Sequence, residues 1–220
     1  MMPHLSIIFD LDGTLLDTLE GIGKTANQVL DQLQFEQHPL EAYKMYVGDG
    51  LRSLMQRSCP TNTDGQTIDR SCTLFAEIYA GEWKKSCRPY EGVVQLLTEL
   101  KNMKIPLAVL SNKPHSFTKL FTEEFLPHNI FAAVYGQREG VAKKPDPVVA
   151  LEIAARLGTA PSRTIFVGDT AVDIETGKSG GMLTAGVLWG FRDARELSAA
   201  HADNIISHPM ELMDHVVSLT

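Results

Sequence analysis

The sequence predicts an α/β protein: a doubly wound parallel-sheet (Rossmann-like) core with an inserted small helical cap domain. A short apolar run near the start ends in two acids. From about residue 92, apolar runs alternate with helical patterns, which implies crossover connections and a parallel sheet covered on both faces. Between these parts, residues 18–85 carry helical patterns alone. We therefore expect a discontinuous core of residues 1–17 and 86–220, interrupted by a cap at 18–85.

Residues Leu5–Phe9 are the first expected strand. The run is apolar, lacks helical spacing and ends at a turn, which is typical of a buried strand. It ends in Asp10 and Asp12, and Gly13 then allows a sharp backbone turn. Carboxylates at the end of a buried strand cost free energy unless a metal, a base or a substrate compensates them. This stretch is therefore the first candidate for a chemical site.

The helical block starts with a pattern over residues 18–34, where apolar residues recur at helical spacing. A second segment ends at Val47–Gly50, and another helical pattern follows it. A third pattern covers residues 67–84. The hinges of this block are expected near residues 16–20 and 86–91.

An alternating series of helices and strands completes the chain. The expected elements are a helix at 92–103, a strand at Ile105–Leu110, a helix at 114–125, a strand at Phe131–Tyr135, a helix at 146–157, a strand at Thr164–Val167, a helix at 171–179, strands at Leu183–Val187 and Asn204–Ile206, and a helix starting near residues 208–209. Ligands of open α/β sheets bind outside the carboxyl ends of the strands. The residues that follow each strand are therefore the ones to inspect.

Phosphoryl transfer is the chemistry that Asp10 and Asp12 suit. One carboxylate can attack phosphorus and form an aspartyl-phosphate. The other can protonate the leaving oxygen and later deprotonate water. Because the attacking carboxylate and the phosphate are both anionic, Mg²⁺ would reduce their repulsion by binding oxygens of both. We therefore expect Mg²⁺ as the cofactor.

Polar side chains also follow later strands. Ser111 and Asn112 follow the strand at 105–110. A hydroxyl and backbone N–H groups there could hold a phosphate oxygen, and a helix N-cap is an equal alternative. Lys143 and Lys144 follow the next strand, where a lysine could balance phosphate and carboxylate charge. A solvated charged loop is the alternative for these lysines.

Asp169 and Asp173 follow the strand at 164–167. Two acids four residues apart at a helix start lie on the same face. Helix capping alone explains Asp173 well, because acids favour helix N-termini. It explains Asp169 less well, since this residue comes directly after the strand and Gly168.

The string from Phe9 to Thr18, Phe-Asp-Leu-Asp-Gly-Thr-Leu-Leu-Asp-Thr, resembles the first motif of the haloacid-dehalogenase-like hydrolase superfamily, and most closely its phosphoglycolate phosphatase-like group. Ser111, Lys144 before Pro145, and Gly-Asp-x-x-x-Asp at 168–173 resemble the other three motifs, in the same order. The resemblance thus covers nearly the whole chain.

The resemblance implies a Mg²⁺-dependent phosphatase that hydrolyses a small, phosphoglycolate-like phosphomonoester through an aspartyl-phosphate. Asp10 would be the nucleophile and Asp12 the acid and base. Mg²⁺ would be held by the Asp10 carboxylate, the Asp12 backbone carbonyl and Asp169. Asp173 would support the metal site or the lysine.

The resemblance also implies residues that would bind the phosphoryl group and the rest of the substrate. Ser111, Asn112 and Lys144 would hold the transferring phosphoryl group. Gly48 and Gly50 resemble the glycine-containing substrate loop of related caps. Arg52 could bind a substrate carboxylate, or it could be a solvated helix residue. Trp83 and Trp189 are interpreted as packing residues.

Net charge, apolar runs and cysteine spacing indicate which partners and which location to expect. The formal net charge of −7 disfavours nucleic acid or an anionic membrane as a partner. No apolar run approaches the roughly 18–20 residues of a membrane span, and no signal peptide is visible. Three cysteines without metal-binding spacing fit reduced thiols. We therefore expect a cytoplasmic monomer or homodimer that acts on a small phosphorylated metabolite.

Three alternatives remain open. A sugar-phosphate mutase, β-phosphoglucomutase-like, would use the same four motifs but would keep water from the phospho-enzyme, so phosphate release distinguishes it. A pyrophosphatase or nucleotidase would also use this core. A regulatory binding module on a retired hydrolase core is the non-enzymatic alternative. The intact clustered acids argue against it, because an unused site has no need of them.

Overall fold

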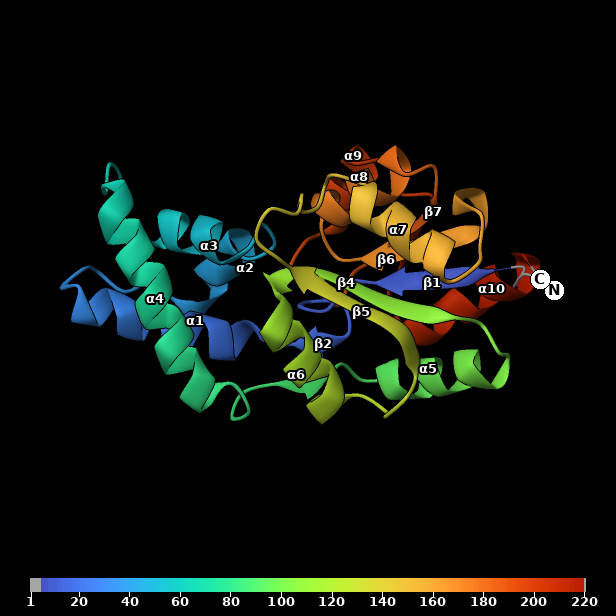
Figure 1. Cartoon of the computed structure of the whole chain (residues 1–220), viewed down its shortest axis with the longest axis horizontal. Helices are drawn as coiled ribbons and strands as arrows, with labels where there is room; N and C mark the ends of the chain where they lie inside the picture. Colours follow the sequence, from blue (N-terminus) through green and yellow to red (C-terminus); the bar gives the residue numbers. More distant parts are fainter. Residues whose placement is uncertain (1–4, 220) are drawn as a thin grey trace. The chain divides into compact units, whose positions relative to one another are not determined.

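The computed structural model describes residues 5–219, which form two compact units (Figure 1). The described residues up to Leu16 and those from Pro89 onward make the first unit, and Asp17–Arg88 make the second. The chain passes between the units at β2 (Leu16–Asp17) and β3 (Arg88–Pro89), which pair as a small two-stranded sheet. No strand was expected at either place, because two residues carry no periodic pattern.

A six-stranded parallel sheet lies at the centre of the first unit and confirms the expected α/β class. Its order is β5-β4-β1-β6-β7-β8. The strands are β1 (Ser6–Phe9), β4 (Leu107–Pro114), β5 (Phe131–Gln137), β6 (Thr164–Gly168), β7 (Leu183–Val187) and β8 (Asn204–Ile206). Ile8 of β1 lies between Ala108 of β4 and Phe166 of β6. The strand order reverses between β1 and β6, which is where ligands bind in such sheets.

Helices cover both faces of this sheet. They are α5 (Val93–Asn102), α6 (His115–Phe125), α7 (Val148–Arg156), α8 (Ala171–Ser179), α9 (Ala194–Ala199) and α10 (Leu212–Leu219). In Figure 1, α5 and α10 lie on one side of the sheet and α7 and α8 on the other. Ile153 of α7 is buried in one apolar cluster with Ile8 and Phe166. Each such side chain stabilises the fold by about 1.5–3 kcal/mol, and this packing fixes the strand ends.

Several elements of the first unit differ from expectation. β5 ends at Gln137, two residues beyond the expected Tyr135. β4 continues to Pro114 instead of ending at Leu110, and residues 111–113 are buried within it. Their polar side chains favoured a loop, but the backbone continues to pair with β5, where Pro114 lies opposite Gln137. The helix α9 was not expected, because six residues with one buried side chain give no periodic signal.

The second unit is helical among its described elements, as the pattern of residues 18–85 predicted. Its helices are α1 (Leu19–Gln32), η1 (Leu40–Ala42), α2 (Tyr43–Tyr46), α3 (Leu51–Ser58) and α4 (Gly65–Glu82). Asn27 ties α1 to the following loop, since its amide donates to His38 O (2.8 Å) and its Oδ1 accepts from His38 N–H (2.9 Å) and Tyr43 OH (2.7 Å). No helix within residues 5–219 combines the length and apolar character needed to cross a membrane.

Candidate active site

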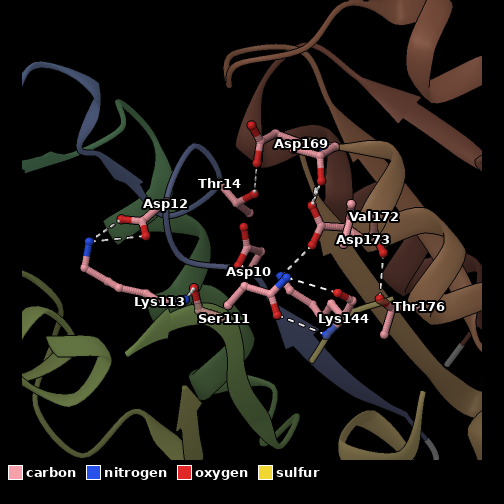
Figure 2. A network of polar contacts seen from close by, with 12 residues as sticks. Asp10, Asp12, Thr14, Ser111, Lys113, Lys144, Asp169, Val172, Asp173 and Thr176 are labelled. Carbon is pink, nitrogen blue, oxygen red and sulfur yellow. Dashed lines mark hydrogen bonds and ion pairs between the residues drawn. The ribbon is translucent and has the colours of Figure 1, made fainter. Parts of the chain in front are cut away.

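Asp10 lies directly after β1 and is only 7% exposed. Its N–H donates to Val167 O at 2.9 Å, which fixes it against β6. Lys144 Nζ donates to Asp10 Oδ1 at 2.7 Å and to Asp173 Oδ1 at 2.6 Å (Figure 2). One buried ammonium therefore joins carboxylates from β1 and α8. The neighbouring Lys143 is exposed, so the structure places Lys144 at this edge of the sheet and not Lys143.

Asp173 has two sets of contacts. Its Oδ2 accepts from the Thr170 N–H (3.1 Å) and the Thr170 hydroxyl (2.8 Å), which completes a capping box at the start of α8. Its Oδ1 accepts from Lys144. Capping and contact with the lysine are therefore both properties of this side chain.

Asp169 is fully buried and bound from two sides. Thr14 Oγ1 donates to its Oδ1 at 3.1 Å, and the Phe191 N–H donates to its Oδ2 at 2.8 Å. Gly13 has φ +88°, and a Cβ there would lie 2.4 Å from Asp169 Oδ2. A Cβ on Gly190 would lie 2.3 Å from Asp169 Cβ. Two residues without side chains therefore make room for this carboxylate.

The cluster carries more negative charge than its lysine balances. Burial raises the pKa of Asp10 to about 7, although Lys144 opposes the shift. Burial and the charges of Asp173 and Asp10 raise the pKa of Asp169 well above its usual value. Burial alone would lower the pKa of Lys144, but the two carboxylates outweigh it and raise that pKa. Ligand oxygens of Asp10, Asp169 and Asp173 lie within 4.8 Å of one another, an arrangement suited to a hard cation.

Ser111 and Asn112 lie inside β4, so their interpretation as caps of α6 is wrong. The N-cap of α6 is Pro114, without a side-chain hydrogen bond. Asn112 Nδ2 donates to Lys144 O at 3.1 Å, and its Oδ1 accepts from Lys144 N–H at 3.0 Å. Asn112 thereby fixes the backbone that carries the lysine. Ser111 is 3% exposed, and its Oγ accepts from Lys113 N–H at 3.2 Å.

Asp12 lies apart from the cluster, towards Lys113 (Figure 2). Lys113 Nζ donates to Asp12 Oδ1 at 3.0 Å and to Oδ2 at 3.2 Å. The side chains of Lys113 and Asp12 are 5% and 11% exposed, so this ion pair is largely shielded from solvent. Sequence reasoning did not select Lys113. Its one signal was its place in Ser-Asn-Lys after an apolar run, and a lysine before a helix is usually solvated.

The three cap residues singled out in the sequence belong to the second unit. Gly50 is the N-cap of α3, and Gly48 lies two residues before it. Arg52, in the first turn of α3, forms an exposed ion pair with Asp69 of α4. The guanidinium therefore has a partner within its own unit.

Known proteins are similar to this chain in sequence and in fold. A profile of the haloacid dehalogenase-like hydrolases matches residues 7–187. The chain belongs to this family. The phosphoglycolate phosphatase of Aquifex aeolicus (strain VF5) is 30% identical over 215 residues, which cover 96% of this chain and 98% of that protein. The phosphoglycolate phosphatase of Psychrobacter arcticus is 30% identical over 211 residues, 91% and 92% of the two chains.

A solved structure with a similar fold supports the same family assignment. A candidate phosphoglycolate phosphatase from Lactobacillus delbrueckii subsp. bulgaricus superposes with a TM-score of 0.90 at 25% identity, covering 98% of this chain and 99% of that one. The resemblance seen in the four motifs is thus confirmed. This haloacid dehalogenase-like hydrolase is an enzyme of the phosphatase class.

Proposed function

We propose that the enzyme is a Mg²⁺-dependent phosphatase that hydrolyses a small phosphomonoester, phosphoglycolate in particular, through an aspartyl-phosphate on Asp10. The observation that carries this proposal is the buried cluster of Asp10, Asp169 and Asp173 at the carboxyl edge of the sheet, in which Asp10 and Asp173 share the ammonium of Lys144. The named relatives support phosphoglycolate as the first substrate to test. A cytoplasmic location is part of the same proposal.

The donor set fits a magnesium ion. Its carboxylate oxygens are hard ligands, and the cluster holds three acids but one lysine, so a cation would balance the remaining negative charge. The Asp10 carboxylate, the Asp12 backbone carbonyl and Asp169 would hold Mg²⁺. When bound, Mg²⁺ would supply positive charge that lets an ionised Asp10 and an anionic phosphate meet.

In the proposed mechanism Asp10 is the nucleophile and Asp12 transfers the protons. A carboxylate oxygen of Asp10 attacks phosphorus as the bond from phosphorus to the leaving oxygen breaks, and Asp12 gives that oxygen a proton. Water then attacks phosphorus, Asp12 takes a proton from it, and the bond to Asp10 breaks. Inorganic phosphate leaves, Asp10 is again an ionised carboxylate, and Asp12 again carries the proton that it gives in the next cycle.

Other side chains hold the transferring group. Ser111, the Asn112 backbone and Lys144 would bind its oxygens, where positioning and charge stabilisation carry most of phosphoryl-transfer catalysis. Asp173 would keep the Lys144 ammonium in place, since the two are 2.6 Å apart. Gly48, Gly50 and Arg52 are proposed to contact the organic part of the substrate.

The test is release of inorganic phosphate from phosphoglycolate, hexose phosphates, nucleotides and pyrophosphate, with Mg²⁺ and with a chelator. We expect the largest signal from phosphoglycolate, its loss in chelator, and a fall of about a thousandfold or more in Asp10→Asn. Asp214→Asn, at an exposed position of α10, is the matched control. Turnover retained in Asp10→Asn, or isomerisation of a sugar phosphate without phosphate release, would contradict the proposal.

A further inference from the structure

Two buried lysines bind three of the four carboxylates of the site. Lys144 binds Asp10 and Asp173, whereas Lys113 binds Asp12. The two lysines come from different elements, since Lys113 lies near the end of β4 and Lys144 lies before α7. The ion pair of Lys113 has no part in the mechanism proposed above, although it engages both oxygens of the acid and base.

Both the backbone and the ammonium of Lys113 have fixed contacts. Its N–H donates to Ser111 Oγ (3.2 Å), and its carbonyl accepts from Thr118 Oγ1 (3.1 Å). Its Nζ lies 4.2 Å from the centre of the Phe121 ring. The residue is 8% exposed within β4. An ammonium confined in this way fixes the position of the Asp12 carboxylate that it binds through both oxygens.

Asp12 needs such a partner because of its place in the chain. It lies two residues after Asp10, which belongs to a group of three acids with one lysine, and the charge of Asp12 contributes to the raised pKa of Asp10. A carboxylate without its own cation would be repelled by that group or would compete for its metal. The strand order supplies the cation, because β4 is the neighbour of β1.

We propose that Lys113 is the positioning residue of the acid and base Asp12, holding its carboxylate within reach of the leaving oxygen and of the attacking water. This inference rests on the proposed function, in which Asp12 transfers both protons. Lys113 itself contacts neither phosphorus nor the leaving oxygen in this role. Its loss leaves Asp10, Lys144 and Asp169 in place and misplaces Asp12.

The leaving group separates this role from a purely structural one. An alkoxide such as that of phosphoglycolate needs a proton to leave, whereas p-nitrophenolate leaves without one. The value of kcat/KM reports the steps up to phosphoryl transfer to Asp10. A misplaced Asp12 therefore lowers kcat/KM for phosphoglycolate and spares kcat/KM for p-nitrophenyl phosphate.

The experiment measures kcat/KM for both substrates in Lys113→Met, Asp12→Asn and the double variant. Lys119→Met, at an exposed position of α6, is the matched control. We expect Lys113→Met to lose about 100-fold with phosphoglycolate and less than about fivefold with p-nitrophenyl phosphate. In the Asp12→Asn background, Lys113→Met should cause no further loss. The control should equal the wild type with both substrates.

Equal losses for the two substrates, or losses that multiply in the double variant, would overturn the inference. If the loss of kcat/KM in Asp12→Asn differs between the two substrates and the loss in Lys113→Met does not, the role of Lys113 is refuted and the proposed mechanism stands. If Asp12→Asn spares both substrates, the proposed mechanism fails and the inference fails with it. If Lys113→Met shows no cooperative thermal unfolding, Lys113→Arg carries the same test. The arginine variant retains a cation, so we expect a smaller loss of kcat/KM than in Lys113→Met. This loss must still be larger with phosphoglycolate than with p-nitrophenyl phosphate, and it must be absent in the Asp12→Asn background.

Discussion

At the scale of single residues, the site is defined by charge that the protein leaves unbalanced. Asp10, Asp169 and Asp173 are each at most 7% exposed and lie together. Lys144 forms ion pairs with Asp10 and Asp173 and with neither oxygen of Asp169. Burial, and then the charges of Asp173 and Asp10, raise the pKa of Asp169 well above its usual value. Without a bound cation, ionisation of Asp10 and of Asp169 therefore works against folding.

This charge imbalance predicts how stability depends on pH in metal-free protein. Burial raises the folded pKa of Asp10 from 3.8 to about 7. The stability that comes from its protonated form is complete below pH 3.8 and is lost as the pH rises through 7. Asp10→Asn cannot ionise, so its free energy of unfolding relative to wild type should increase between pH 4 and 8 by up to about 4 kcal/mol.

Urea unfolding in a chelator at several pH values measures this difference. Asp214→Asn, at an exposed position, is the control, and its free energy of unfolding should stay close to that of the wild type. A difference between Asp10→Asn and wild type that stays constant across the range would contradict the charge imbalance.

Part of the residue-level site could be predicted from the sequence. Asp10, Lys144 and Asp169 each follow a recognisable apolar run, and parallel strands bring their ends to one edge. The partner of Lys113 could not be predicted, because Asp12 is 101 residues away in the chain and the contact depends on β4 lying beside β1. The hydrogen bonds of Asn112 to Lys144 depend on the same tertiary placement.

At the scale of elements, the segment after β7 holds the loop after β1 against Asp169. Trp189 Nε1 donates to Thr14 O at 2.9 Å, and the Phe191 N–H donates to Asp169 Oδ2 at 2.8 Å. Gly190, between them, packs directly on Asp169. The indole of Trp189 thus fixes the backbone of Thr14, and its role as a packing residue stays a prediction.

Gly190→Ala should disturb this arrangement. Its Cβ would lie 2.3 Å from Asp169 Cβ and 2.4 Å from Gly13 O, and a backbone atom cannot move aside as a flexible side chain can. We expect a loss of about 1–3 kcal/mol in the free energy of unfolding and weaker Mg²⁺ binding in a calorimetric titration. Gly81→Ala, in α4 with nothing within 4 Å of its Cβ, is the control and should be neutral or slightly stabilising. Equal behaviour of the two variants would show that Gly190 does not constrain Asp169.

Some elements have the bounds that the sequence predicted, although they are short. β7 and β8 have their expected bounds, Leu183–Val187 and Asn204–Ile206, because each is an apolar run between turns. β4 was predicted too short, since the polar side chains at 111–113 are buried by partners that the pattern does not show. Two-residue strands and the six-residue α9 have no periodicity to detect.

At the scale of the whole molecule, the acids of the site belong to one unit. Asp10 and Asp12 precede Leu16, and Asp169 and Asp173 follow Pro89, so all four lie in the first unit. The second unit, Asp17–Arg88, contributes none of them. A ligand that binds the folded site and not the unfolded chain adds to the stability of the unit that contains it.

Mg²⁺ should therefore raise the thermal midpoint of the first unit. At about 100 times its Kd, the ion adds roughly 2.7 kcal/mol, which corresponds to a rise of about 5 to 10 °C for a chain of this size. Asp169→Asn should lose most of this rise, because it removes a proposed ligand, whereas Asp214→Asn should keep it. Thermal unfolding followed with Mg²⁺ and with Na⁺ at matched ionic strength measures the shift. If the units unfold separately, only one transition should move. A Mg²⁺ shift that survives in Asp169→Asn, or one that moves both transitions equally, would place the ion outside the cluster.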